Sequence, residues 1–141
     1  MTRPETPRAP APPPLSEAQM EIMNVVWEQG ESTVSAVWKA IAAQRPVARN
    51  TVQTMMVRLE EKGWLRCSAE GHAFRYRAVK PREDVLGGMV ERLVDSAFGG
   101  SAEGLVLALL HGRGVTPTEV QRIRRMIDEA EQETKTRRAE R

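Results

Sequence analysis

The sequence predicts a mainly α-helical fold with one small β-hairpin. Apolar residues recur at helical spacing in three short segments between residues 15 and 62. The period then changes to the alternation of strands over residues 64–79, and three further helical segments follow residue 81. Short amphipathic helices bury their apolar stripes only by packing on one another, so we expect the first three helices to share one small core.

The composition is that of a soluble globular protein. Charged residues make up 28% of the chain, and no apolar run approaches the roughly 20 residues that span a bilayer. We therefore expect a cytoplasmic protein that does not insert into a membrane. The single cysteine, Cys67, excludes an internal disulfide and a multi-thiolate metal site within one chain.

Start and stop signals predict the first helix. Residues 1–14 form a proline-rich tail without apolar periodicity, for which we expect no packed structure. Ser16 then offers an N-cap, and Gln19, three residues later, completes a capping box. Gly30 provides the stop.

A second helix follows after a short connection. Ser32 or Thr33 caps it, and Pro46 ends it or the connection that comes next. Trp27 of the first helix and Trp38 of the second lie on apolar stripes, so we interpret both as core residues.

The third helix, which ends at Gly63, is the most informative one. Its apolar stripe, at spacing i, i+3, i+4 and i+7, consists of Val52, Met55, Met56 and Leu59. The other side carries short amides and hydroxyls with cations: Arg49, Asn50, Thr51, Gln53, Thr54 and Arg58. Such side chains suit base edges and phosphates. The helix alone fits an ordinary solvated face equally well.

A hairpin follows directly. Residues 64–68 and 73–79 read as two strands, and residues 69–72 read as the turn between them. Phe74 and Tyr76 share one face of the second strand, whereas Arg75 and Arg77 share the other. A hairpin with two outward arginines after a helix-turn-helix is typical of the wing of a winged helix, where cations contact the phosphate backbone. His72, in the turn, is interpreted as a phosphate or solvent contact.

The second half is helical and strongly apolar. A broad stripe runs along residues 85–97, and Leu105–Leu110 is apolar on every side, so we expect that segment to be buried on every side. About sixty residues are too few to enclose it, and small helical units of this kind often need a partner. We expect a homodimer held by Leu86, Met89, Val90, Leu93, Leu105, Leu109, Ile123 and Ile127.

These patterns divide the chain into four expected parts: a proline-rich tail (1–14), a winged-helix DNA-binding domain (15–80), a helical dimerisation domain (81–130) and a charged tail (131–141) that frays. We expect no catalytic site, no metal and no cofactor. No glycine-rich phosphate loop occurs, and neither His72 nor His111 has a carboxylate or cysteine at metal-binding or catalytic-triad spacing.

Four segments together resemble the penicillinase repressor family, which includes repressors of β-lactamase and methicillin-resistance genes. They are residues 15–23, 50–65, 74–76 and 98–101, and the specific part is Asn-Thr-Val-Gln-Thr-Met-Met-Val-Arg-Leu-Glu-Glu-Lys-Gly-Trp-Leu at 50–65. The resemblance implies an N-terminal winged helix, a C-terminal three-helix dimerisation region and a homodimer that represses transcription at a palindromic operator. It places Asn50, Thr51, Gln53 and Thr54 in the major groove.

The resemblance also implies relief of repression by proteolysis, with a membrane-bound sensor metallopeptidase as partner. Staphylococcal members are cut at an Asn-Phe bond in the fifth helix, and the corresponding bond here is Ala108–Leu109. This difference in sequence argues against cleavage by a protease of the same specificity. Two other readings of the chain stay open at this stage: a winged-helix module that binds proteins, and a regulator that responds to a small molecule.

Overall fold

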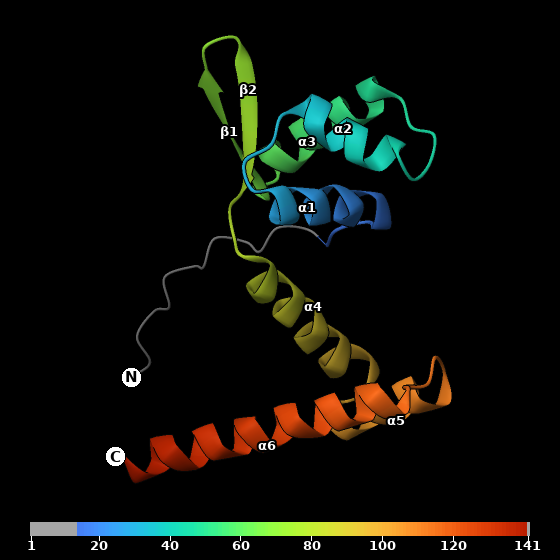
Figure 1. The fold of residues 1–141 in the computed structure, drawn as a ribbon, viewed down its shortest axis with the longest axis vertical. Helices are drawn as coiled ribbons and strands as arrows, with labels where there is room; N and C mark the ends of the chain where they lie inside the picture. The colour runs from blue at the N-terminus through green and yellow to red at the C-terminus, as the bar shows by residue number, and fades with distance from the viewer. Residues whose placement is uncertain (1–13, 141) are drawn as a thin grey trace, which may run out of the picture. The chain divides into compact units, whose positions relative to one another are not determined.

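The computed structural model describes residues 14–140. Six helices and a two-stranded antiparallel sheet follow one another in the order α1 (Glu17–Gln29), α2 (Val34–Ala42), α3 (Arg49–Glu61), β1 (Leu65–Glu70), β2 (Ala73–Ala78), α4 (Arg82–Ala97), α5 (Ala102–His111) and α6 (Pro117–Ala139) (Figure 1). The predicted fold class, mainly helical with one small hairpin, is confirmed. The proline-rich tail, apart from residue 14, lies outside the described residues.

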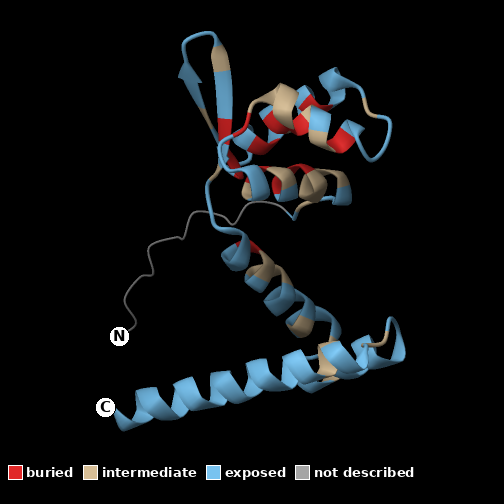
Figure 2. Cartoon of the chain, viewed as in Figure 1, coloured by how far each residue is buried: buried red, intermediate tan, exposed pale blue. Residues whose placement is uncertain are grey.

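The chain forms two compact units, Met1–Gly88 and Met89–Arg141. In the first unit, α1, α2 and α3 pack on one another and on the base of the hairpin (Figure 1). Figure 2 shows the buried residues in these helices, at the base of the hairpin and at the start of α4. The core consists of Ile22, Met23, Val26, Val37, Ile41, Val52, Met56, Leu59, Trp64, Leu65, Tyr76 and Val85.

The first two helices begin at capping residues that the sequence predicts. The hydroxyl of Ser16 accepts from the backbone N–H of Gln19 at 3.2 Å, and the Gln19 side chain accepts from the N–H of Ser16 at 3.0 Å, which completes the capping box of α1. Thr33 caps α2, since its hydroxyl accepts from the N–H of Ala36 at 3.1 Å. Ser32, the alternative cap, is buried and serves the hairpin instead.

The two tryptophans that the sequence assigns to the core are only half-buried. The indole N–H of Trp27 donates to the carbonyl oxygen of Lys80 at 3.0 Å, and that of Trp38 donates to the carbonyl oxygen of Val47 at 2.9 Å. A tryptophan at the rim of a core can bury its ring edge and still place its polar N–H on a backbone acceptor. The fully packed tryptophan is Trp64, at the end of α3.

The first strand of the hairpin extends further towards the turn than predicted. Strand β1 continues through Glu70, which pairs with Ala73, so the turn is reduced to Gly71 and His72. Gly71 has φ +64°, a left-handed conformation that glycine adopts without a Cβ clash, and tight two-residue hairpin turns use such residues. The expected turn at residues 69–72 is therefore too wide by two residues, Ala69 and Glu70, which both belong to β1.

The second unit contains no buried residue among those described, 89–140. The expectation that Leu105–Leu110 is buried on every side is wrong for the single chain: Val106, Leu107, Leu109 and Leu110 of α5 are about half exposed. The physical reason is that α5 is apolar all round, whereas the rest of its unit supplies too little surface to cover it (Figure 2).

Helix α6 continues to Ala139 and so includes most of the expected charged tail, residues 131–141. Its start is the predicted one: Thr116 and Glu119 form a capping box, with Pro117 in the first turn. Beyond Pro117 the helix contains neither glycine nor proline, and Glu131 and Lys135 stand at the favourable i, i+4 spacing. Among the described residues, no single helix is long and apolar enough to cross a membrane, although α4 and α5, bent by 92° at their junction, pass that test as a pair.

Candidate nucleic-acid interface

Helix α3 has two chemically different sides. Val52, Met56 and Leu59 are at most 1% exposed and fix the helix to its unit. The opposite side is open, and there a shallow hollow is lined by Asn50, Gln53, Thr54, Val57, Arg58 and Glu61. The predicted polar residues of α3 therefore share one surface, with Thr51 exposed beside it. Val57 is the apolar exception on this side.

The start of α3 is open to an anion. Ala48 occupies its N-cap position and has no side-chain acceptor for the first N–H groups of the helix. Such groups attract negative charge, as does the positive end of the helix dipole. Arg49 begins the helix, and its guanidinium donates to the hydroxyl of Ser35 at 3.3 Å, which holds the cation beside the start of α2.

A second recess, of 330 Å³, lies between the start of α2, the start of α3 and the hairpin. Gln53 lines this recess as well as the α3 hollow, so the two are neighbouring parts of one polar surface. The residues around the recess are Thr33, Val34, Ser35, Arg49, Gln53, His72, Ala73, Phe74 and Tyr76. Predicted site residues from α3 and from the hairpin turn thus meet in one place.

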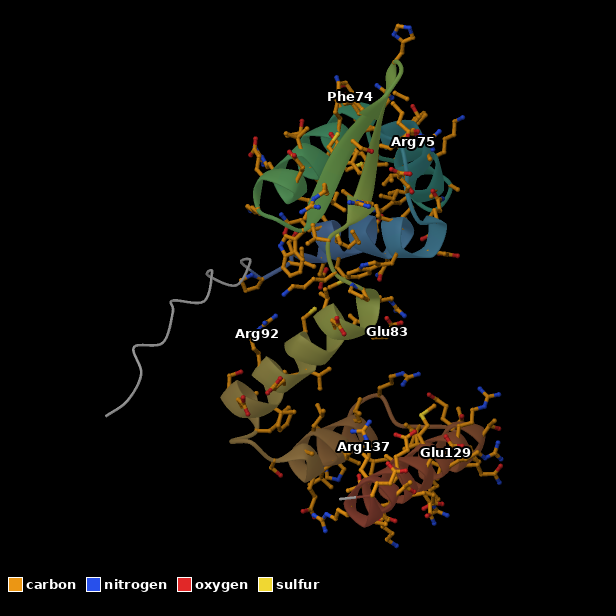
Figure 3. All side chains as sticks on the ribbon, turned by 90° about the vertical axis from the view of Figure 1, so that its left-hand side faces the viewer. Phe74, Arg75, Glu83, Arg92, Glu129 and Arg137 are labelled. Atoms are coloured by element: carbon orange, nitrogen blue, oxygen red, sulfur yellow. The ribbon has the colours of Figure 1, made fainter. Side chains whose placement is uncertain are left out.

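The hairpin separates its aromatic residues from its arginines. Phe74 and Tyr76 face the recess, whereas Arg75 and Arg77 alternate with them and point the other way. Figure 3 shows Phe74 and Arg75 on opposite sides of the hairpin. The structure therefore does not place Arg75 and Arg77 in the recess with Arg49 and Gln53. They form the outer, exposed face of the hairpin.

This outer face carries the three cations Arg66, Arg75 and Arg77 together with Glu70, and Glu31 accepts a hydrogen bond from the hydroxyl of Ser68 there at 3.1 Å. Arg66 stands directly opposite Arg77 in the strand register, and Ser68 stands opposite Arg75. Like charges directly across two strands repel, and a counter-charge supplied from outside the chain would relieve that repulsion. Within residues 14–140 the ion pairs are Arg45–Glu21 and Arg113–Glu119, so none of the hairpin arginines is neutralised in this way.

The hairpin is tied to the helices by backbone hydrogen bonds. The N–H of Val79 donates to the carbonyl of Trp64 at 3.0 Å, and Ser32 pairs with Tyr76 in an isolated antiparallel bridge. Tyr76 is buried, and burial, followed by its contact with Cys67, raises its pKa above the usual 10.0. The base of the hairpin is therefore fastened to the helical core, whereas Phe74 near its tip is exposed.

Three residues of this surface were missed from the sequence: Val57, Arg66 and Phe74. A signal existed for Arg66, because the inward positions of Leu65 and Cys67 leave it on the outer face. Phe74 is 64% exposed, although it shares a face with buried Tyr76, because its register position lies beyond the end of the core. Helical periodicity alone also places Val57 with the polar residues of α3.

The residues predicted for dimerisation lie on α4, α5 and α6, and none of these residues is buried in the single chain. Leu86, Met89 and Leu105 are half-buried, and Val90, Leu93, Leu109, Ile123 and Ile127 are exposed. In the described part of the chain, no three His, Cys, Asp or Glu residues are placed to hold a metal ion.

Comparison with known proteins relates this chain to a family of repressors. The family model described as "Penicillinase repressor" matches residues 15–129. The penicillinase repressor of Bacillus licheniformis is 25% identical over 117 residues, 83% of this chain and 91% of the relative. The transcriptional regulator BlaI of Mycobacterium tuberculosis (strain CDC 1551 / Oshkosh) is 29% identical over 119 residues, 83% of this chain and 85% of the relative. The solution structure of monomeric Bacillus licheniformis BlaI in complex with the blaP half-operator is 31% identical, with 52% of this chain and 90% of that chain covered and a TM-score of 0.47.

Proposed function

Since this chain belongs to the penicillinase repressor family, we propose that it is a homodimeric transcriptional repressor that binds a palindromic operator in promoter DNA. Helix α3 enters the major groove, and the hairpin contacts the flanking backbone. The observation that carries this proposal is the side of α3 on which Asn50, Gln53 and Thr54 line one open hollow with Arg58. The protein works in the cytoplasm, where the DNA is, and without an enzymatic activity of its own.

The division of contacts follows from side-chain chemistry. Asn50 and Gln53 carry amides that form paired hydrogen bonds with the edge of adenine, and Thr54 carries a hydroxyl and a methyl group that suit a base or a phosphate. Arg49, Arg58 and the hairpin cations Arg75 and Arg77 suit phosphates, and Thr51 and His72 lie at the edge of the same surface. Base contacts supply the specificity, and phosphate contacts supply the register and much of the affinity.

The exposed apolar residues of the second unit support the homodimer. It exposes Leu107, Leu109 and Leu110 on one helix, and Ile123 and Ile127 on another. Large exposed apolar surfaces on soluble proteins are typical of protein–protein interfaces. A second copy is the simplest cover, because a twofold dimer uses the same face of both chains and presents two α3 helices to two half-sites.

Relief of repression by proteolysis completes the proposal, with a membrane-bound sensor metallopeptidase as the protease. The bond Ala108–Leu109 lies inside α5, and both residues are exposed in the single chain. A helix must unwind locally before it enters a protease active site, so a chain freed from its dimer would be cut faster than a paired one. Mass spectrometry of fragments from cells in which the regulated gene has been derepressed tests this point; an intact chain in derepressed cells contradicts it.

The proposal is tested by selecting duplexes from a random DNA library with the full-length chain. We expect one palindromic sequence to be enriched, to be protected in a footprint and to occur upstream of a regulated gene, with affinity that falls steeply as salt rises. Enrichment of no sequence would contradict a specific repressor.

The dimer is tested separately by sedimentation. Leu109→Glu places a charge on a side chain that is already exposed in the single chain, so the monomer has little to lose from it. We expect this variant to be monomeric, whereas Arg138→Glu, near the end of α6, stays dimeric. An unchanged dimer in Leu109→Glu would show that α5 is not the interface.

A further inference from the structure

Val57 is the one apolar side chain that lines the α3 hollow. It is 37% exposed, whereas the apolar residues that hold α3 to its unit, Val52, Met56 and Leu59, are at most 1% exposed. Val57 therefore does not belong to the core stripe. A scattered apolar surface residue is ordinary, so its position among polar neighbours, and not its exposure, is the informative observation.

That position is in line with the polar residues proposed to read bases. Asn50, Gln53, Thr54 and Val57 stand at i, i+3, i+4 and i+7, so they form one row along the helix. A recognition helix in the major groove presents side chains to successive base pairs at this spacing. A residue at the fourth place of the row lies on the same side of the helix as the first three.

We propose that Val57 recognises a thymine through van der Waals contact with its C5-methyl group. This inference rests on the proposed function and deepens it. The thymine methyl is the apolar group that the base edges display in the major groove, and an apolar side chain is what matches it. The amides of Asn50 and Gln53 take the neighbouring hydrogen-bonding positions.

The side chain is well suited to this contact before DNA arrives. Valine is branched at Cβ and adopts one strongly preferred χ1 rotamer in a helix, so little side-chain freedom is lost on binding. Arg58, the next residue in the hollow, carries the positive charge that holds the helix near the phosphates. Burial of one methyl-sized group is worth about a fourfold change in affinity for each thymine contacted.

The test uses the duplex that the full-length chain enriches from a random library. Each thymine is replaced in turn by deoxyuridine, which removes only the C5-methyl group, and the affinity of three proteins is measured: the wild type, Val57→Ala and Val79→Ala. Val79 is a matched control, because it is an exposed valine at the end of the hairpin and outside the hollow. Val57→Ala is expected to fold normally, since an exposed valine is exchanged for a better helix former.

We expect one thymine per half-site at which deoxyuridine weakens the wild type about fourfold. Val57→Ala should bind the thymine duplex as weakly as the wild type binds the deoxyuridine duplex, and should no longer distinguish the two. Val79→Ala should behave as the wild type. The inference alone would be overturned if Val57→Ala still distinguished thymine from deoxyuridine as strongly as the wild type does. It would also be overturned if no deoxyuridine replacement in the enriched duplex weakened binding of the wild type. Failure to enrich any duplex would overturn the proposed function and the inference together.

Discussion

The backbones of Ser32 and Tyr76 exchange two hydrogen bonds, from the N–H of Ser32 at 2.9 Å and from the N–H of Tyr76 at 2.8 Å. Both residues are buried. One belongs to the connection between α1 and α2, and the other to the middle of β2, so this bridge adds a third strand-like segment to the two-stranded sheet. It fixes the hairpin relative to α2 and α3, and thereby the distance between the two parts of the proposed interface.

Replacing Ser32 by proline removes one of these donors and leaves the carbonyl of Tyr76 without its partner. A buried polar group without a hydrogen bond costs about 1–3 kcal/mol, so we expect Ser32→Pro to lower the free energy of unfolding by that amount. Ser32→Ala is the control, because it keeps both backbone bonds and loses only the hydroxyl contacts with the carbonyl of Gly30 and the side-chain oxygen of Gln29. Urea denaturation of both variants gives the comparison, and an equal loss in the two would show that the bridge adds nothing.

The first unit could be predicted from the sequence because its signals are local. The capping box of Ser16 and Gln19 and the switch to strand alternation each depend on residues a few positions apart. The polar side of α3 could be predicted in the same way, since a 3.6-residue period places Gln53 and Thr54 away from Val52 and Met56.

The burial of side chains could not be predicted equally well, because it depends on which other segments or chains pack against them. The pattern of Leu105–Leu110 shows that these residues favour an apolar environment, but it does not show whether one chain supplies it. Phe74 is a similar case: alternation gives its face, whereas its exposure depends on where the core ends. The last part of α6 has a mixed charge and no apolar stripe, but its Glu, Gln, Lys and Arg residues have good helix propensity.

Arg75→Ala should weaken binding to all DNA sequences by a similar factor. Its side chain lies on the outer face of the hairpin, away from the recess that α3 lines, so it can neutralise a phosphate without reading a base. Each phosphate contact contributes about 0.9 to the slope of log affinity against log salt, so we expect the slope to fall by about that amount. Arg137→Ala, on α6, is the matched control and should leave the slope unchanged (Figure 3). A loss confined to the operator sequence would instead assign Arg75 to base recognition.

Gln53→Ala should reduce discrimination between DNA sequences and leave the salt dependence of binding unchanged. Gln53 lines both the α3 hollow and the recess beside the hairpin, so its amide is at the centre of the surface proposed to face the bases. A paired amide–adenine contact is worth about 1–3 kcal/mol of discrimination, so we expect the variant to lose that much preference for operator over a single-base variant of it. The salt slope should not change. Competition binding with the two duplexes measures both quantities, and undiminished discrimination would return Gln53 to the ordinary surface.

The titration of Tyr76 tests the base of the hairpin without DNA. It is the only tyrosine of the chain, so the absorbance of phenolate reports on this residue alone. Burial and the neighbouring Cys67 raise its pKa above 10.0, which means that the folded chain holds the proton more tightly than the unfolded chain does. The stabilisation is therefore fully present below pH 10.0 and is lost as the pH rises from there through the folded-state value. We expect Cys67→Ala to lower the pKa of Tyr76 while leaving it above 10.0, since burial, the larger cause, remains. Tyr76→Phe should lose stability less steeply with pH in this range, and a wild-type titration at the ordinary value would mean that the hairpin base opens in solution.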